Sequence, residues 1–300
     1  MHRCIIGPFL ALICAGCARQ PSTQSQLFQR FGAVLNLGAS VNGPTFDGGP
    51  SLASDGLSLY FASDRPGGAG GADLWIARRT AVAASFELPT NLGRNVNSDA
   101  NESAPDISAD GLVLVFDSDR PGGSGSYDLW ITTRSTTDLP FGTPGNLGPG
   151  VNSGESEGHP HLSADGLRLY FQGRGPGGFG DADVWMAIRA RVSDPFGAAV
   201  NLGAGVNTRH FDGEPTVSSD GLTLIFSSDR PGGCGERDLW LAARPSVAVP
   251  FGPARHLGCS LNSPAHDVTP SLARDGTVLF FMSNRPGGIG SLDLWMVTFG

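Results

Sequence analysis

Acidic residues recur through the sequence at one fixed spacing, always three positions before a proline. They are Asp47, Glu102, Glu157, Asp212 and Asp267, each 55 residues from the next. Five carboxylates around one point repel unless they are paired, hydrated or bridged by a cation. The pattern therefore predicts a surface that docks a cation, an amine or a partner's basic side chain, and hard oxygen ligands favour Ca²⁺ as the cation. The alternative is structural, with each acid capping local amides or pairing with a nearby arginine.

Those arginines follow the same spacing, within a repeated Arg-Pro-Gly-Gly motif. They are Arg65, Arg120, Arg230 and Arg285. An aspartate eight residues after each motif arginine, such as Asp73, is expected to lock the turn by accepting hydrogen bonds from its amides or by pairing with the arginine. We expect the first acidic series and the arginines to lie on one face of the fold, which we take as the candidate binding face.

The third repeat departs from this pattern. It reads Gly173-Arg174-Gly175 where the others read Ser-Asp-Arg or Ser-Asn-Arg, so it lacks the motif arginine. Two histidines flank Pro160 at strand spacing and could project to one side. We interpret this sector as an asymmetric recognition patch made of His159, His161, Arg174, Asp181, His210 and Glu214. A metal site has little support because spacing fixes no third ligand, and solvated loop histidines are the simpler interpretation.

The composition excludes several classes of function. A net charge of −8 argues against a nucleic-acid partner, and a chain without lysine has neither Schiff-base chemistry nor a Walker-type phosphate site. No nucleophile elbow or H-E-x-x-H motif is present. A glycosidase needs two non-equivalent carboxylates about 5–9.5 Å apart, and Glu157 with Glu214 or Asp181 could supply them. Because the acids recur once per repeat, as structural residues would, we expect a protein without enzymatic activity.

The N-terminal residues have the features of an export signal. The apolar run from Cys4 to Ala15 is too short to cross a bilayer, so residues 1–16 are interpreted as a signal peptide and 17–30 as a tether. Cys14-Ala15-Gly16-Cys17 resembles a bacterial lipoprotein signal in which Cys17 is acylated, although that family usually has leucine where Cys14 stands. Ala18 favours the outer membrane by analogy, with membrane contact only through the lipid. The alternative is cleavage near Ala18, which would give a soluble periplasmic protein.

Cysteine usage fits an exported protein. Beyond the signal region only Cys234 and Cys259 remain, an even number in an oxidising compartment. They could form a disulfide that closes a loop of about 25 residues. Two buried free thiols are the alternative.

The whole chain beyond residue 30 is a repeat. Five tryptophans are also 55 residues apart, and 44 glycines with 22 prolines indicate many turns. Each repeat predicts four short antiparallel strands, as in a propeller blade. Residues 31–42 carry an outer-strand pattern with no blade before them, and the C-terminus lacks one. We therefore expect residues 31–300 to form an all-β, five-bladed β-propeller that the N-terminal strand closes by completing the last blade.

These motifs resemble the TolB-type, WD-like β-propeller repeats of bacterial envelope proteins. The resemblance covers five units, from about Phe31 to the C-terminus, and rests on Asn-Leu-Gly, Val-Asn, Ser-x-Asp-Gly and Arg-Pro-Gly-Gly. It implies binding or scaffolding in the envelope, with no catalytic residues to carry over and no required cofactor. We expect a monomer that binds an envelope protein or a glycan, and a lectin-like propeller is the alternative. The tryptophans are expected to pack between the sheets, with sugar stacking as their alternative role.

Overall fold

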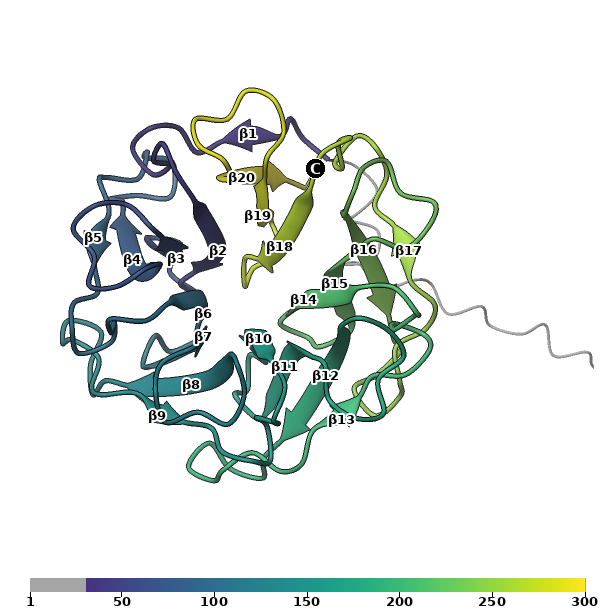
Figure 1. Cartoon of the computed structure of the whole chain (residues 1–300). Coiled ribbons are helices and arrows are strands. Elements are labelled where there is room, and N and C mark those ends of the chain that lie inside the picture. Colours follow the sequence, from purple (N-terminus) through teal and green to yellow (C-terminus); the bar gives the residue numbers. More distant parts are fainter. Residues whose placement is uncertain (1–30, 300) are drawn as a thin grey trace, which may run out of the picture.

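The computed structural model describes residues 31–299, which form five four-stranded antiparallel sheets. The sheets are arranged radially around a central axis as the blades of a propeller (Figure 1). The all-β, five-bladed fold predicted from the sequence is confirmed. The signal peptide, the tether and Cys17 lie outside the described residues.

Each blade has the same strand order from the axis to the rim. The innermost strands are β2 (Asp47–Leu52), β6 (Glu102–Ile107), β10 (Glu157–Leu162), β14 (Asp212–Val217) and β18 (Asp267–Leu272). The second strands are β3 (Ser58–Ser63), β7 (Val113–Ser118), β11 (Arg168–Gly173), β15 (Thr223–Ser228) and β19 (Val278–Ser283). The third strands are β4 (Asp73–Arg78), β8 (Asp128–Thr133), β12 (Asp183–Ile188), β16 (Asp238–Ala243) and β20 (Asp293–Thr298). The two-residue outer strands are β1 (Leu35–Asn36), β5 (Thr90–Asn91), β9 (Gly145–Asn146), β13 (Val200–Asn201) and β17 (Arg255–His256).

The ring closes as the sequence predicted. Strand β1 pairs with β20, so the last sheet has the order β1-β20-β19-β18. The Asn42 side chain strengthens this junction, because its amide oxygen accepts from Leu294 N at 2.8 Å and its Nδ2 donates to Leu294 O at 3.1 Å. The equivalent asparagines of the other repeats, which are Asn97, Asn152, Asn207 and Asn262, make the same two bonds to their third strands, which explains why this asparagine recurs.

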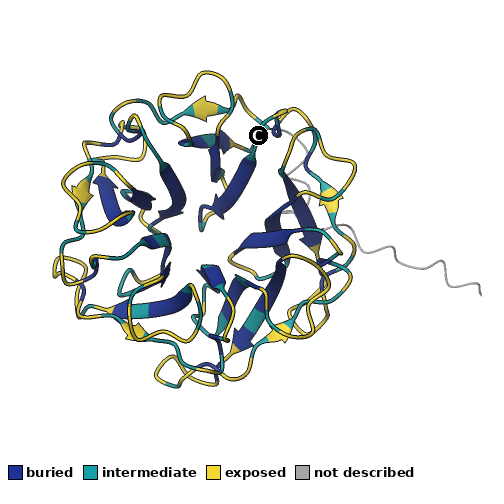
Figure 2. Cartoon of the chain, viewed as in Figure 1, coloured by how far each residue is buried: buried dark blue, intermediate teal, exposed yellow. Residues whose placement is uncertain are grey.

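The core lies between adjacent blades. Leu59, Phe61 and Trp75 of the first blade pack with Phe280 and Leu294 of the last. Figure 2 shows that the strands near the axis are buried whereas the rim strands and loops are exposed. The five tryptophans are 6–8% exposed, as expected for residues that pack between sheets. Burial of apolar faces on both sides of each blade is the main force holding the ring together.

Each innermost strand contains a bulge just before its proline. The pairing register shifts there in all five blades, and the residue at the bulge has a positive φ. Four of these residues are not glycine: Ala104, His159, Glu214 and Thr269, with φ between 43° and 56°. The left-handed region costs such residues energy, so packing around the axis must hold them there. The bulges turn the side chains of His159 and Glu214 into the axial region.

Candidate functional site

The five recurrent acids are buried at the starts of the innermost strands. Their exposure is 0–2%, and each accepts a hydrogen bond from the backbone N–H four residues earlier. In four blades the acid is also paired with the motif arginine of its own blade. The Arg120–Glu102 pair, for example, is 2.8 Å long. The structural alternative raised by the sequence therefore describes how these carboxylates are used.

The four arginines form one recurring arrangement, which we call the arginine clamp. In each clamp the guanidinium Nη2 contacts both the acid and a backbone carbonyl oxygen. For Arg120, Nη2 lies 2.7 Å from Val96 O. Its Nε donates to the serine hydroxyl that ends the second strand. Its Cζ lies 4.9–5.1 Å from a phenylalanine ring and 5.1–5.5 Å from the blade's tryptophan ring. Each clamp thus fills the space above its blade's aromatic residues.

The structure does not bring the five acids together. Among residues 31–299, Cys234, Asp238 and His256 are the only group of three or more potential ligands whose atoms lie within 4.8 Å of one another. No three of the five acids are therefore this close in the described chain, and calcium at the acidic series stays a prediction. Cys234 forms a disulfide with Cys259, their Cα atoms 5.8 Å apart, so its sulfur is not available as a thiolate ligand.

The third blade has a cavity where the other blades have an arginine. It measures about 220 Å³, and Glu157, Phe171, Gly173, Gly175 and Trp185 contribute to its lining. Among residues 31–299, Glu157 accepts only local hydrogen bonds, from Ser153 N at 2.8 Å and Ser153 Oγ at 2.5 Å, and has no arginine beside it. The glutamate is 2% exposed. Burial raises the pKa of its carboxyl above the ordinary value, and the negative charges of Asp128 and Glu155 raise it further, against the lowering effect of the Ser153 hydrogen bonds.

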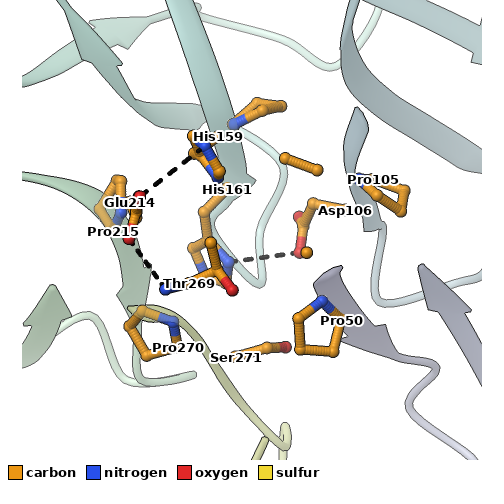
Figure 3. A pocket seen from close by; sticks show the side chains of 13 residues that line it. Pro50, Pro105, Asp106, His159, His161, Glu214, Pro215, Thr269, Pro270 and Ser271 are labelled. Atoms are coloured by element: carbon orange, nitrogen blue, oxygen red, sulfur yellow. Dashed lines mark hydrogen bonds and ion pairs between the residues drawn. The ribbon is translucent and has the colours of Figure 1, made fainter. Parts of the chain in front are cut away.

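The residues predicted to form the recognition patch lie at separate places. His159, His161 and Glu214 line the axial pocket (Figure 3). Arg174 and Asp181 form an exposed pair with 3.4 Å between Nη2 and Oδ1. His210 lies 3.7 Å from Asp229 on the entry loop of the fourth blade. His159 and His161 thus lie on the same pocket, but the six residues do not form a single patch.

The axial pocket is small, and the polar side chains that line it form hydrogen bonds and ion pairs with other protein groups. His161 Nδ1 is 3.3 Å from Asp106 Oδ1, and Glu214 accepts a 2.9 Å hydrogen bond from Thr269 N (Figure 3). The remaining Glu214 oxygen is 3.5 Å from Arg237 Nη1 and 4.0 Å from His159 Nε2. The cavity of about 30 Å³ has room for one or two water molecules.

Two residues of this region were missed by sequence reasoning. Asp106 accepts bonds from Ser51 Oγ at 3.2 Å and Leu162 N at 2.8 Å, which joins three blades. Arg274 donates across the axis to Ile107 O at 3.0 Å. Burial raises the pKa of the Asp106 carboxyl, but the charges and hydrogen bonds around it, those of His161 first and the charge of Arg274 next, outweigh burial and hold it below the ordinary value. The only sequence signal was that both residues break the repeat.

Neither carboxylate pair considered for glycoside hydrolysis shares a pocket. Glu157 lines the cavity of the third blade, whereas Glu214 lines the axial pocket. Asp181 is exposed and pairs with Arg174. No helix long and apolar enough to cross a membrane occurs among the described residues.

Comparisons with known proteins support the fold and leave the activity open. No family model matches the sequence. No curated protein matches it either. Among solved structures, TolB from Acinetobacter baumannii is 14% identical with a TM-score of 0.54, over 85% of this chain and 55% of its own. A putative TolB from Agrobacterium tumefaciens is 16% identical with a TM-score of 0.52, over 83% of this chain and 76% of its own.

Glycoside hydrolase structures match equally well. A GH43_1 enzyme from Xanthomonas citri, solved with xylotriose, is 18% identical with a TM-score of 0.56, over 91% of this chain and 92% of its own. Identities this low establish a shared β-propeller architecture and nothing finer. The class of protein is therefore a five-bladed β-propeller, and its activity has to be argued from its own residues.

Proposed function

We propose that this chain is a non-catalytic binding module of the bacterial envelope. Its binding face is formed by the loops that enter the innermost strands and by the Arg-Pro-Gly-Gly loops. The observation that carries the proposal is the cavity of the third blade on this face, where a buried carboxylate and two aromatic rings line about 220 Å³. The four sister blades fill the same place with their own arginine. A polar group among aromatic rings in a concave site is typical of ligand recognition.

The geometry at the axis supports binding over glycoside hydrolysis. Hydrolysis needs two carboxylates on either side of a bound sugar, with space for the ring between them. Here Asp106 and Glu214 are buried and fully engaged by protein groups, around a cavity that holds one or two waters. Our interpretation of residues 1–16 as an export signal supports a function outside the cytoplasm.

The test maps where a partner binds. The mature protein is immobilised, envelope proteins and glycans that it retains are purified, and their binding is remeasured with pure components. Hydrogen–deuterium exchange then compares the free and bound protein. We expect protection in residues 147–154 and 174–178 on the binding face, and none in 163–167 on the opposite face.

Three results would overturn the proposal. They are the absence of any partner that binds in purified form, protection confined to the opposite face, and release of reducing ends from xylo-oligosaccharides or arabinoxylan. Retention of glycans alone, with protection of the same loops, would establish the lectin-like form of the binding module.

A further inference from the structure

The cavity of the third blade is an arginine clamp without its arginine. Gly175 occupies the position of the motif arginine, and Gly173 replaces the serine that receives the arginine Nε. The remaining parts of the clamp are retained: Glu157 as the acid, Phe171 and Trp185 as the rings, and the residue whose carbonyl accepts from Nη2, here Val151. The other blades therefore show what this cavity is shaped to hold.

The sister clamps specify the geometry of the missing group. In the fourth blade Arg230 Nη2 lies 2.5 Å from Asp212 Oδ1 and also donates to Val206 O. Its Cζ is 5.1 Å from the centroids of both the Phe226 and the Trp240 rings. The group is thus a planar cation held by one carboxylate and one carbonyl and packed against two aromatic rings.

Nothing in the third blade blocks this position. A Cβ built on Gly175 would meet only Trp185 Cζ2, at 3.9 Å. The rim of the cavity includes Pro149, Pro176 and Ala198, all exposed, so a group from outside can enter. Inside, Glu157 is buried and has no cationic partner within the described part of the chain. A buried carboxylate without a counter-charge gains most from a cation that fits its surroundings.

We propose that this cavity binds a guanidinium group, namely the arginine side chain of an envelope protein partner. The inference deepens the proposed function and rests on it for the identity of the partner. A guanidinium fits better than an ammonium because it is flat, packs on aromatic faces and is more weakly hydrated. It would donate to Glu157 and to the carbonyl of Val151 and lie against Phe171 and Trp185, as Arg230 does among its own partners.

The experiment uses N-acetyl-arginine amide as the probe and N-acetyl-lysine amide as its control. Binding to the mature protein is followed by calorimetry and by NMR of the Trp185 indole. We expect one site for the arginine probe, with binding at least about fivefold weaker for the lysine probe. Gly175→Arg, which supplies the clamp from within, should weaken binding of the arginine probe at least about tenfold, because the cavity is then filled. Glu157→Gln should weaken it by a similar factor through loss of the charge-assisted bond.

A matched variant moves the site to another blade. Arg230→Gly empties the clamp of the fourth blade, and we expect the stoichiometry of the arginine probe to rise from one to two. If Glu157→Gln does not fold, Gly175→Arg and Arg230→Gly still decide the matter. Equal binding of both probes, or unchanged binding to a folded Gly175→Arg protein, would overturn the proposal.

The two proposals fail separately. If partners protect the binding face but the arginine probe does not bind, the guanidinium inference is wrong and the binding module stands. If the probe binds but no partner protects this face, the cavity is a guanidinium site and the proposed function is wrong. Once a partner is identified, replacing its interfacial arginine by lysine should weaken the complex. If no such substitution at any arginine of the partner lowers the affinity, the guanidinium does not come from a protein side chain.

Discussion

Completing the fifth clamp should make the protein more stable. In the substitution Gly175→Arg, the new side chain starts from a backbone position with open space above it and can reach Glu157, as Arg120 reaches Glu102. A charge-assisted hydrogen bond contributes about 1.5–3 kcal/mol, a cation–π contact about 0.5–1, and replacement of glycine about 0.4–1. Ordering an arginine side chain costs about 2 kcal/mol. The expected net gain is about 0.4–3 kcal/mol, or about 1–12 °C in Tm for a domain of this size.

The stability gained by Gly175→Arg should depend on pH in a definite direction. Because the pKa of Glu157 is raised in the folded protein, ionisation of this group lowers stability as the pH rises through the folded pKa. The groups that raise this pKa besides burial are Asp128 and Glu155, and those that lower it are the Ser153 hydroxyl and amide. The advantage of Gly175→Arg should therefore be largest at neutral pH and smaller below the ordinary glutamate pKa of 4.5.

The assay is thermal and urea unfolding of the mature protein at neutral and acidic pH. Ala83→Arg is the control, since it adds an arginine at an exposed position on the opposite face and should change stability by less than about 0.5 kcal/mol. Arg120→Gly is the mirror experiment and should lose a comparable amount, because Glu102 then lacks its partner. A folded Gly175→Arg protein that is no more stable than the control, while Arg120→Gly is clearly destabilised, would refute the assignment of the cavity as an empty clamp.

Three further predictions concern the ring itself. Replacing Cys234 and Cys259 by serine should lower the free energy of unfolding by about 3 kcal/mol, as expected for a disulfide that closes a loop of 25 residues. A wild-type Tm that reductant does not change would contradict a disulfide that stabilises the fold. Deleting residues 1–37 removes β1 and exposes the edge of β20, so gel filtration should show concentration-dependent association, which a persistently monodisperse deletion variant would exclude. The pKa of Asp106 is lowered in the folded protein, so the stability that its carboxylate contributes is present above the ordinary pKa of 3.8 and is lost as the pH falls through the folded pKa. Upon acidification the unfolding curve of the wild type should therefore converge on that of Asp106→Asn. Curves that stay parallel would contradict a stabilising role of the Asp106 carboxylate.

The sequence by itself determined the fold because each repeat carries the same local signals. Turn residues, alternating apolar positions and one tryptophan per repeat specify four short strands, and five equal units leave one way to complete the last sheet. The N-terminal strand could be assigned because residues 31–42 carry the outer-strand motif without a blade of their own. The hydrogen bonds between this asparagine and the third strand are made within one repeat length in four blades, as those of Asn97 to Leu74, and so leave a periodic trace in the sequence.

Only the tertiary structure decided how the charged residues are used. From the sequence, the recurrent acids could either face one channel together or each pair with an arginine. In four blades the acid forms an ion pair with the arginine 18 residues later. The third blade has a cavity because Gly175 lacks the side chain that fills this space in the other blades. The backbone at Val151 and the rings of Phe171 and Trp185 line the space that is left. Asp106 and Arg274 meet other blades across the axis, and contacts between residues so far apart in sequence leave no periodic signal by which they could have been found.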